Sequence, residues 1–425
     1  MNTAGLSIDQ APPLAVPLAF YALMPIALVA AGGLLALQGN VLFATNWLPQ
    51  TIAWTHLVTL GALLPAMLGS LYQMVPVVLG TPVPAIRLAF AVAAALAVGT
   101  SSFVLGLLVG IGWLVQLGAV ALAVALVCFL LPVGLALARA QGGGPTRTGM
   151  RGAFLCLLAL AMVGLRLAWG HATGTLPQAR QVWLTVHIAL ALLGWIGGLT
   201  MAVSWQVVPM FYLTQPFPPR LTRVLALALP GSALLVALAG LADLPLPQVL
   251  LTALPAALVI WLLQPAVLAH QIRGRRRRRS DPTLQFWWLG LACAPLVLLA
   301  AVLTWTTDWP PAPLLFGWLA LVGWAGATIH GMLTRIAPFL VWFHAFSTRD
   351  SRTDVPPMRR LLPDKQVRWN LGLHALTLVC GVGAIASGND AAARVTGVLL
   401  TVTGVLLGAA LLGTVRRARP QRVAS

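Results

Sequence analysis

Long apolar runs alternate with short polar segments along the chain, and this pattern predicts an all-α polytopic membrane protein. Most of the runs exceed the roughly 20 apolar residues that a helix needs to cross a bilayer. We place twelve spans near residues 14–37, 51–79, 85–109, 111–139, 153–169, 181–213, 221–241, 246–272, 284–304, 313–343, 368–387 and 391–415. The first run lacks a preceding basic segment and is long for the core of a cleaved signal peptide, so we expect it to remain a membrane span.

One motif occurs three times, in the second, sixth and tenth spans. Its copies cover residues 55–78, 186–211 and 315–340, and each ends in a polar residue, two further residues and a proline. These prolines, Pro76, Pro209 and Pro338, are 133 and 129 residues apart. The spacing predicts three pseudo-repeats of four helices in parallel orientation, near 14–139, 153–272 and 284–415, within a single membrane domain covering 1–425. This plan differs from the two halves of six helices that are common in transporters.

The composition agrees with lipid as the main surrounding of the chain. Of its residues 59% are hydrophobic and 8% are charged, where a soluble domain carries about 25% charged residues. The net charge of +18 does not indicate a nucleic-acid partner, because the basic residues form short clusters between apolar runs. The strongest clusters, at 139–151, 273–279 and 416–422, follow the fourth, eighth and twelfth spans. The positive-inside rule therefore predicts that both termini lie in the cytoplasm, and we expect a bacterial cytoplasmic membrane with the lipid bilayer as partner.

Two copies of the motif carry a histidine near their start, His56 and His187, and the third has Phe316 near that place. Twelve helices in three arcs of four, with a histidine high on the second helix, resemble subunit I of the heme-copper oxidase superfamily, which includes cytochrome oxidases and nitric oxide reductases. The chain also resembles, more loosely, a twelve-span heme- and copper-associated protein of bacterial nitric oxide responses. By this resemblance His56 corresponds to a ligand of the low-spin heme and His187 to a copper ligand. The resemblance implies heme b and copper as candidate cofactors, and an electron donor or other respiratory-chain subunits as candidate partners.

Several positions depart from the pattern of that family. Leu190 and Ala191 stand where the family has a tyrosine or glutamate after the helix-six histidine, and the seventh span has no histidine. The tenth span has Phe316 near the level of the family's His-x-His ligands. The chain contains no glutamate, and Lys365 is its one lysine, so the family's proton-channel residues are missing. The resemblance therefore implies a divergent relative without a complete oxygen-reducing centre, acting in electron transfer, nitrogen-oxide response or assembly. If the protein is an enzyme, the resemblance implies an oxidoreductase of this type.

Ionisable side chains inside membrane spans usually face a partner or a cavity, which makes His56 and His187 candidate heme or metal ligands. The alternative is a neutral histidine that hydrogen-bonds to a neighbouring helix and stabilises its packing. His330 lies deeper in its span than His56 lies in its own, so the two histidines are a poor match as axial ligands of one heme.

The remaining aromatic and histidine side chains on the spans fit the membrane interface. Three tryptophans stand near the starts of the motif spans, where tryptophan commonly forms an interfacial belt: Trp54, Trp183 and Trp318. His270, His344 and His374 lie near basic ends of their spans, and we expect them to anchor those ends at the interface.

Three arginines stand near the ends of spans predicted to face away from the cytoplasm: Arg166, Arg180 and Arg394. A guanidinium group binds planar carboxylates through paired hydrogen bonds, so heme propionates or another anion are candidate ligands. The alternative is an interfacial arginine that extends toward water or pairs with a nearby aspartate such as Asp390.

At the opposite ends of the motif spans, Gln73, Gln206 and Arg335 form a predicted polar ring. The proline that follows each of them leaves a backbone carbonyl without its helical hydrogen bond. These side chains either satisfy such carbonyls or line a water-filled vestibule. We favour the structural role, because the ring recurs in the motif copy that lacks the histidine.

Two other function classes stand beside a heme- or copper-associated protein: a cofactor-free channel or transporter of a small solute, and a structural subunit of a respiratory complex. No aspartate lies in the middle of an apolar run, which argues against proton coupling through carboxylate relays. A bound chromophore separates the first class from the other two.

Overall fold

Helices account for all the regular structure in the described part of the chain. The computed structural model describes residues 7–276, 281–346 and 356–418. Within them lie twelve helices long and apolar enough to cross a membrane, which confirms the predicted all-α class. The basic residues at 277–279 and 419–422 lie outside the described residues. The α-helices are α1 (Ala15–Tyr21), α2 (Leu23–Gln38), α3 (Pro49–His56), α4 (Leu64–Leu79), α5 (Leu88–Val109), α6 (Gly112–Arg139), α7 (Gly144–Thr173), α8 (Arg180–Ala189), α9 (Gly198–Tyr212), α10 (Pro219–Leu241), α11 (Leu246–Leu258), α12 (Gln264–Arg273), α13 (Pro282–Thr306), α14 (Ala312–Trp318), α15 (Ala327–Phe346), α16 (Asp364–Ser387) and α17 (Asp390–Ala418).

The fifth span is the one whose start differs most from the prediction. We predicted it near residue 153, yet α7 begins at Gly144 and carries Arg147 and Arg151 on its first turns. Arg151 donates hydrogen bonds to the carbonyl oxygens of Leu137, at 2.8 Å, and Ala138, at 2.9 Å, near the end of α6. The last carbonyls of a helix lack intrahelical partners and carry partial negative charge, so a cation there is stabilising. These arginines are therefore residues of the helix α7, and Arg151 satisfies carbonyls at the end of α6. Charge counting alone predicted a loop at this place.

The three motif spans share a local change of helix type. Each contains a π-helical stretch at the corresponding place, η3 (Leu57–Leu63), η4 (Leu190–Gly197) and η6 (Leu319–Gly326). In these spans 78%, 72% and 78% of the most apolar window is buried, against 22 to 50% in the other nine. The motif thus marks three similar, well-buried helices, while the larger organisation into units near 14–139, 153–272 and 284–415 stays a prediction.

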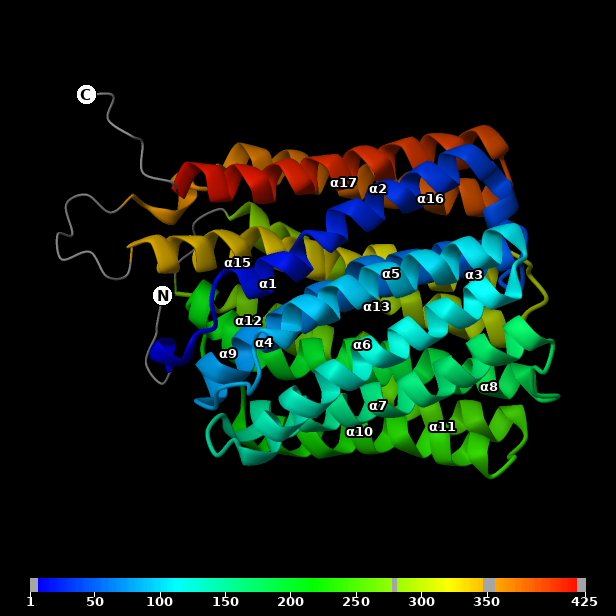
Figure 1. Ribbon diagram of the computed structural model, residues 1–425, viewed down its shortest axis with the longest axis horizontal. Helices are drawn as coiled ribbons and strands as arrows, with labels where there is room; N and C mark the ends of the chain where they lie inside the picture. The colour runs from blue at the N-terminus through cyan, green and yellow to red at the C-terminus, as the bar shows by residue number, and fades with distance from the viewer. Residues whose placement is uncertain (1–6, 277–280, 347–355, 419–425) are drawn as a thin grey trace. The chain divides into compact units, whose positions relative to one another are not determined.

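The chain forms two compact units. The first unit consists of Met1–Pro12 and Leu71–Arg279, and the second of Pro13–Ser70 and Ser280–Ser425. In the second unit α17 lies beside both α2 and α16 (Figure 1). Glycine permits the close approach of α17 to α2, because a Cβ atom at Gly404 would stand 2.8 Å from the backbone nitrogen of Val29.

Close packing of the same kind occurs in the first unit. There α5 packs against α6, α6 against α7, and α7 against α10 (Figure 1). A Cβ atom at Gly118 of α6 would stand 2.5 Å from the backbone nitrogen of Phe103 of α5. Small residues at such contacts let helices gain dispersion contacts that lipid would otherwise supply.

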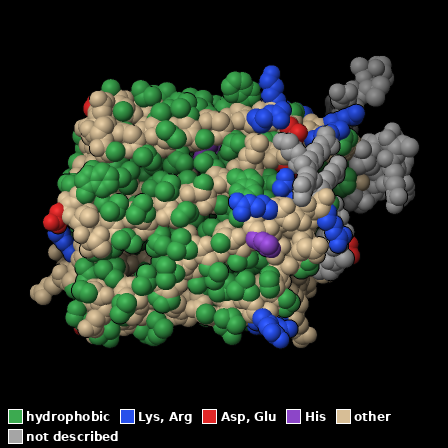
Figure 2. Space-filling view, turned by 180° about the vertical axis from the view of Figure 1, so that it is seen from behind, with side chains coloured by type: hydrophobic (Ala, Val, Ile, Leu, Met, Phe, Trp, Pro, Cys, Tyr) green, Lys and Arg blue, Asp and Glu red, His purple; other side chains and the backbone are tan. Residues whose placement is uncertain are grey.

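Large hydrophobic side chains face outward along the spans. Leu37, Leu131 and Leu227 are 77%, 69% and 68% exposed, which in water would be an unfavourable surface. Hydrophobic side chains are spread over the face drawn in Figure 2, and most of the visible Lys and Arg side chains lie toward one end of it. This distribution fits an integral membrane protein in contact with a lipid bilayer.

The contacts of Arg151 predict a stability effect. Replacing this residue in the Arg151→Ala variant leaves carbonyls at the end of α6 without charged donors, and we expect unfolding to become easier by about 1–3 kcal/mol. The measurement is unfolding of the full-length protein in detergent micelles. Arg139→Ala is the matched control, because Arg139 is an exposed arginine in the last turn of α6. An equal effect in both variants would contradict the role given to Arg151.

Candidate functional site

His56 is the last residue of α3 and directly precedes the π-helical stretch η3. Its ring is half-buried, and its Nδ1 atom lies 2.7 Å from the carbonyl oxygen of Ile52, one turn earlier. A carbonyl only accepts hydrogen bonds, so Nδ1 carries the hydrogen and Nε2 is the unprotonated nitrogen of the neutral ring. This arrangement fixes both the tautomer and the orientation of the ring, as carbonyl partners do for metal-bound histidines.

His187 lies near the start of the sixth span, two residues before the end of α8 and close to η4. Its ring is half-buried against α7, where a Cβ atom at Gly164 would stand 3.0 Å from Cε1 of His187. A glycine at this position therefore leaves room for the imidazole. His187 belongs to the first unit and His56 to the second, so each is described within its own unit.

The prediction of an interfacial belt is wrong for Trp54 and Trp318, while Trp183 is half-buried and its place in a belt stays a prediction. The side chains of Trp54 and Trp318 lie in the core of the second unit, 5% and 2% exposed, and their rings stack at 5.4 Å with an interplanar angle of 19°. The Nε1–H group of Trp54 donates to Ala31 of α2, and that of Trp318 donates to Leu378 of α16. Each indole thus satisfies its polar group on a neighbouring helix while it fills the core.

His374 was expected at the interface, and the structure corrects this prediction. The side chain is buried in the second unit, and its Nδ1 lies 3.3 Å from Nδ1 of His330. Asn370, one turn before His374 on α16, lies 3.1 Å from Nε2 of His330 through its Oδ1. Asn370 was not predicted as a site residue, although polar residues at 366, 370, 374 and 377 follow a helical spacing that indicates one buried face.

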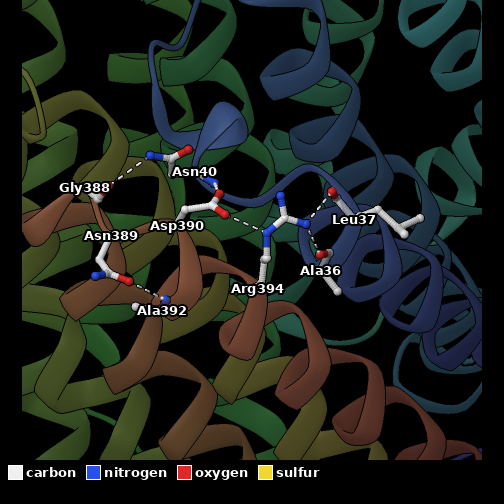
Figure 3. Close-up of polar contacts among 8 residues, drawn as sticks. All are labelled: Ala36, Leu37, Asn40, Gly388, Asn389, Asp390, Ala392 and Arg394. Atoms are coloured by element: carbon white, nitrogen blue, oxygen red, sulfur yellow. Dashed lines mark hydrogen bonds and ion pairs between the residues drawn. The ribbon is translucent and has the colours of Figure 1, made fainter.

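Arg394 has its guanidinium group engaged within the second unit (Figure 3). Its Nε lies 2.7 Å from Oδ2 of Asp390, and its Nη1 donates to the carbonyl oxygens of Ala36 and Leu37 at the end of α2. Asp390 also accepts a hydrogen bond from the backbone nitrogen of Asn40. The aspartate pairing that we considered as the alternative is therefore present, and binding of an anion by Arg394 would have to compete with it.

The other two candidate anion-binding arginines belong to the first unit and are exposed. Arg166 of α7 donates from Nη2 to the carbonyl oxygen of Thr175, at 3.1 Å, just after its helix ends. Arg180 is the first residue of α8. A role for Arg166 or Arg180 in binding propionates or another anion stays a prediction.

The residues of the predicted polar ring have different surroundings. Gln73 is buried, Gln206 is half-buried, and both belong to the first unit. Arg335, in the second unit, forms an ion pair with Asp281, with its Nη1 at 3.4 Å from Oδ2. Asp281 also caps α13 by accepting from the backbone nitrogen of Thr283. Arg335 thus links α15 to the start of α13, which agrees with a structural role, while the ring itself stays a prediction.

Metal-ligating side chains are dispersed in the described ranges 7–276, 281–346 and 356–418. No three His, Cys, Asp or Glu side chains gather there in a way that could hold a metal ion. The four cysteines are free thiols at separate positions. A neutral histidine whose Nδ1 donates to a carbonyl can offer Nε2 to a heme iron, so His56 stays a candidate heme ligand.

No protein family model and no curated protein sequence matches this chain.

The fit of His187 against α7 predicts a coupling between two positions. Gly164→Val places a side chain against the imidazole, and we expect a destabilisation of about 1–3 kcal/mol. The penalty should shrink in a His187→Ala background, where the ring is absent. Unfolding of the two single variants and the double variant measures this coupling. Gly231→Val is the control, because a Cβ atom there meets nothing within 4 Å, and purely additive effects would contradict the contact.

The buried tryptophan stack predicts a strong dependence on one glycine. A Cβ atom at Gly381 of α16 would collide with the indole of Trp318, so Gly381→Ala should destabilise the protein by about 1–3 kcal/mol. Gly383→Ala on the same helix is the control, since a Cβ atom there meets nothing within 4 Å. Tryptophan fluorescence during unfolding reports both variants, and similar stabilities would argue against a tightly packed stack.

Proposed function

We propose that this chain is a heme b-associated integral membrane protein of the heme-copper oxidase subunit I type, with His56 as an axial ligand. The observation that carries the proposal is the hydrogen bond from Nδ1 of His56 to the carbonyl oxygen of Ile52 at 2.7 Å. This bond places the ring hydrogen on Nδ1, so Nε2 carries the lone pair of the neutral imidazole, on a well-buried motif span. The proposed role is electron transfer, nitrogen-oxide response or assembly in a respiratory system.

The residues of the chain would contribute binding and orientation. Heme, when bound, supplies one-electron redox chemistry at its iron. The carbonyl of Ile52 holds the hydrogen of Nδ1, which keeps the ring in one orientation and raises the basicity of Nε2. The helix around His56 limits access of water, because its span is among the most buried of the chain. Together these features would hold one imidazole in a fixed orientation within a buried part of the span.

The proposal does not include reduction of oxygen. In the family that the chain resembles, copper is held by histidines on helices six and seven, and the seventh span here has none. His187 is the remaining candidate for copper, and its neighbourhood on α7 and η4 supplies a close-fitting place for one imidazole. We therefore propose electron transfer or a supporting role in place of catalysis at a binuclear centre.

The proposal predicts a chromophore that depends on His56. The purified protein should show a Soret band and sharp bands after reduction with dithionite, with a pyridine hemochrome of b type and stoichiometric iron. His56→Ala should lose most of this absorbance because an axial ligand is removed. His270→Ala is the control, since His270 is an exposed histidine on α12. Intact spectra in His56→Ala would overturn the ligand assignment.

The same preparation separates the alternatives. A folded but colourless and metal-free protein would favour a channel or transporter of a small solute. Stable co-purification with respiratory subunits would then favour a structural subunit. Copper that is lost selectively in His187→Ala would extend the proposal to the second metal.

A further inference from the structure

The second unit contains a fully enclosed pair of imidazoles. His330 of α15 and His374 of α16 are 0% and 5% exposed, and their rings meet edge to face with centroids 5.2 Å apart. The Nδ1 atoms face one another at 3.3 Å. Phe286 of α13 packs against both rings, with centroid distances of 4.8 Å to His330 and 5.9 Å to His374.

The outer nitrogen of each ring faces an atom that only accepts hydrogen bonds. Nε2 of His374 lies 3.0 Å from the carbonyl oxygen of Val322, in the π-helical stretch η6. Nε2 of His330 lies 3.1 Å from Oδ1 of Asn370. The orientation of this amide is fixed, because its Nδ2 donates to the carbonyl oxygen of Gln366 at 2.9 Å. Each Nε2 must therefore carry a hydrogen to make its bond.

Counting hydrogens shows what the pair requires. Three contacts lie in a row, from Val322 to His374, from His374 to His330 and from His330 to Asn370. Each contact needs one N–H hydrogen, but two neutral imidazoles carry only one each. A neutral pair leaves either two nitrogen lone pairs facing each other or a nitrogen lone pair facing an oxygen. One additional proton completes all three hydrogen bonds.

We propose that His330 and His374 form a binding site for one proton, held between their two Nδ1 atoms. The proton comes from water, the pair gains one positive charge, and no other bond forms or breaks. The carbonyl of Val322 and the amide oxygen of Asn370 stabilise this charge as hydrogen-bond acceptors, and the ring of Phe286 adds an attraction for a cation at this distance. The site does not depend on a bound heme.

Burial disfavours a charge on the pair, and the neutral hydrogen-bond acceptors and more distant charges also set its proton affinity. On α15 the charged or titratable residues are Arg335 and His344, and η6 has none. Three further helices pack against α15. The charged or titratable residues are Asp281 (at the cap) and Cys293 on α13; Asp364, Lys365, Arg368 and Cys380 on α16; and Asp390, Arg394, Arg416 and Arg417 on α17. The ion pairs of Arg335 with Asp281 and of Arg394 with Asp390 neutralise part of this charge.

A metal ion is the competing occupant, and the ligand set favours a proton. Protein metal sites for zinc use three or four side-chain ligands. No third His, Cys, Asp or Glu joins the two histidines to form such a group in the part of the chain that the structure describes. A proton needs only two facing lone pairs.

The test is nitrogen-15 NMR of the full-length, histidine-labelled protein in lipid nanodiscs, between about pH 4 and pH 9, the range that brackets ordinary histidine titration. Loss of signals in His330→Gln and His374→Gln assigns the pair. We expect both Nδ1 signals to change together as the pair takes up one proton. Asn370→Asp should raise the midpoint of uptake by about 1–3 pH units, because a carboxylate then faces Nε2. Asn370→Leu should lower it, because two neutral rings can complete the two contacts that remain.

Asn389→Asp is the matched control, because it adds the same charge at an exposed position before α17 and leaves the pair untouched. Rings that stay neutral over the whole range would overturn the proposal, as would two independent protonations. A metal ion whose removal by a chelator changes both Nδ1 signals would also overturn it. If Asn370→Leu fails to fold, the wild type and Asn370→Asp still decide the question.

Discussion

Polar groups inside a bilayer must find their partners within the protein, because the lipid chains offer none. This chain meets that constraint with 26 Lys and Arg but only 8 acidic residues, so carboxylates cannot be the main partners of its cations. Backbone carbonyls at helix ends accept hydrogen bonds from several of these cations. Arg151 bonds to the end of α6, and Arg394 bonds both to Asp390 and to the end of α2. The same need explains why the buried indoles of Trp54 and Trp318 each reach a carbonyl on a neighbouring helix.

One π-helical stretch, η6, supplies a backbone carbonyl that also accepts a hydrogen bond from a side chain inside the span. In η6, Val322 accepts from the backbone nitrogen of Ala327 and also from Nε2 of His374. A carbonyl oxygen has two lone pairs, so one such group can close a wide helical turn and hold a side chain. His56 uses a carbonyl in its own helix in a related way, just before η3. Histidines thus acquire fixed tautomers in this fold without any carboxylate, which suits both a ligand and a proton site.

The twelve spans could be predicted because their length and apolarity are properties of the sequence alone. The start of α7 could not be predicted from charge, since Arg151 is stabilised by the end of another helix. The position of a residue along a span also does not determine whether its side chain faces the lipid or the core of the protein. For this reason Trp54 and His374 were expected at the interface, although both are buried. The helical spacing of Asn370 and His374 could have predicted that both face the same side of their helix. That His330, on another span, lies beside His374 could be learned only from the folded structure.

The most direct test of the proposed heme site is a cryo-electron microscopy map of the protein purified from its own membranes. We expect planar density joined to Nε2 of His56, with Nδ1 still bonded to the carbonyl of Ile52. A map of equal quality in which side chains or lipid fill the space beyond Nε2 would contradict it. In that case the hydrogen bond to Ile52 would orient the His56 ring only for the packing of the helices.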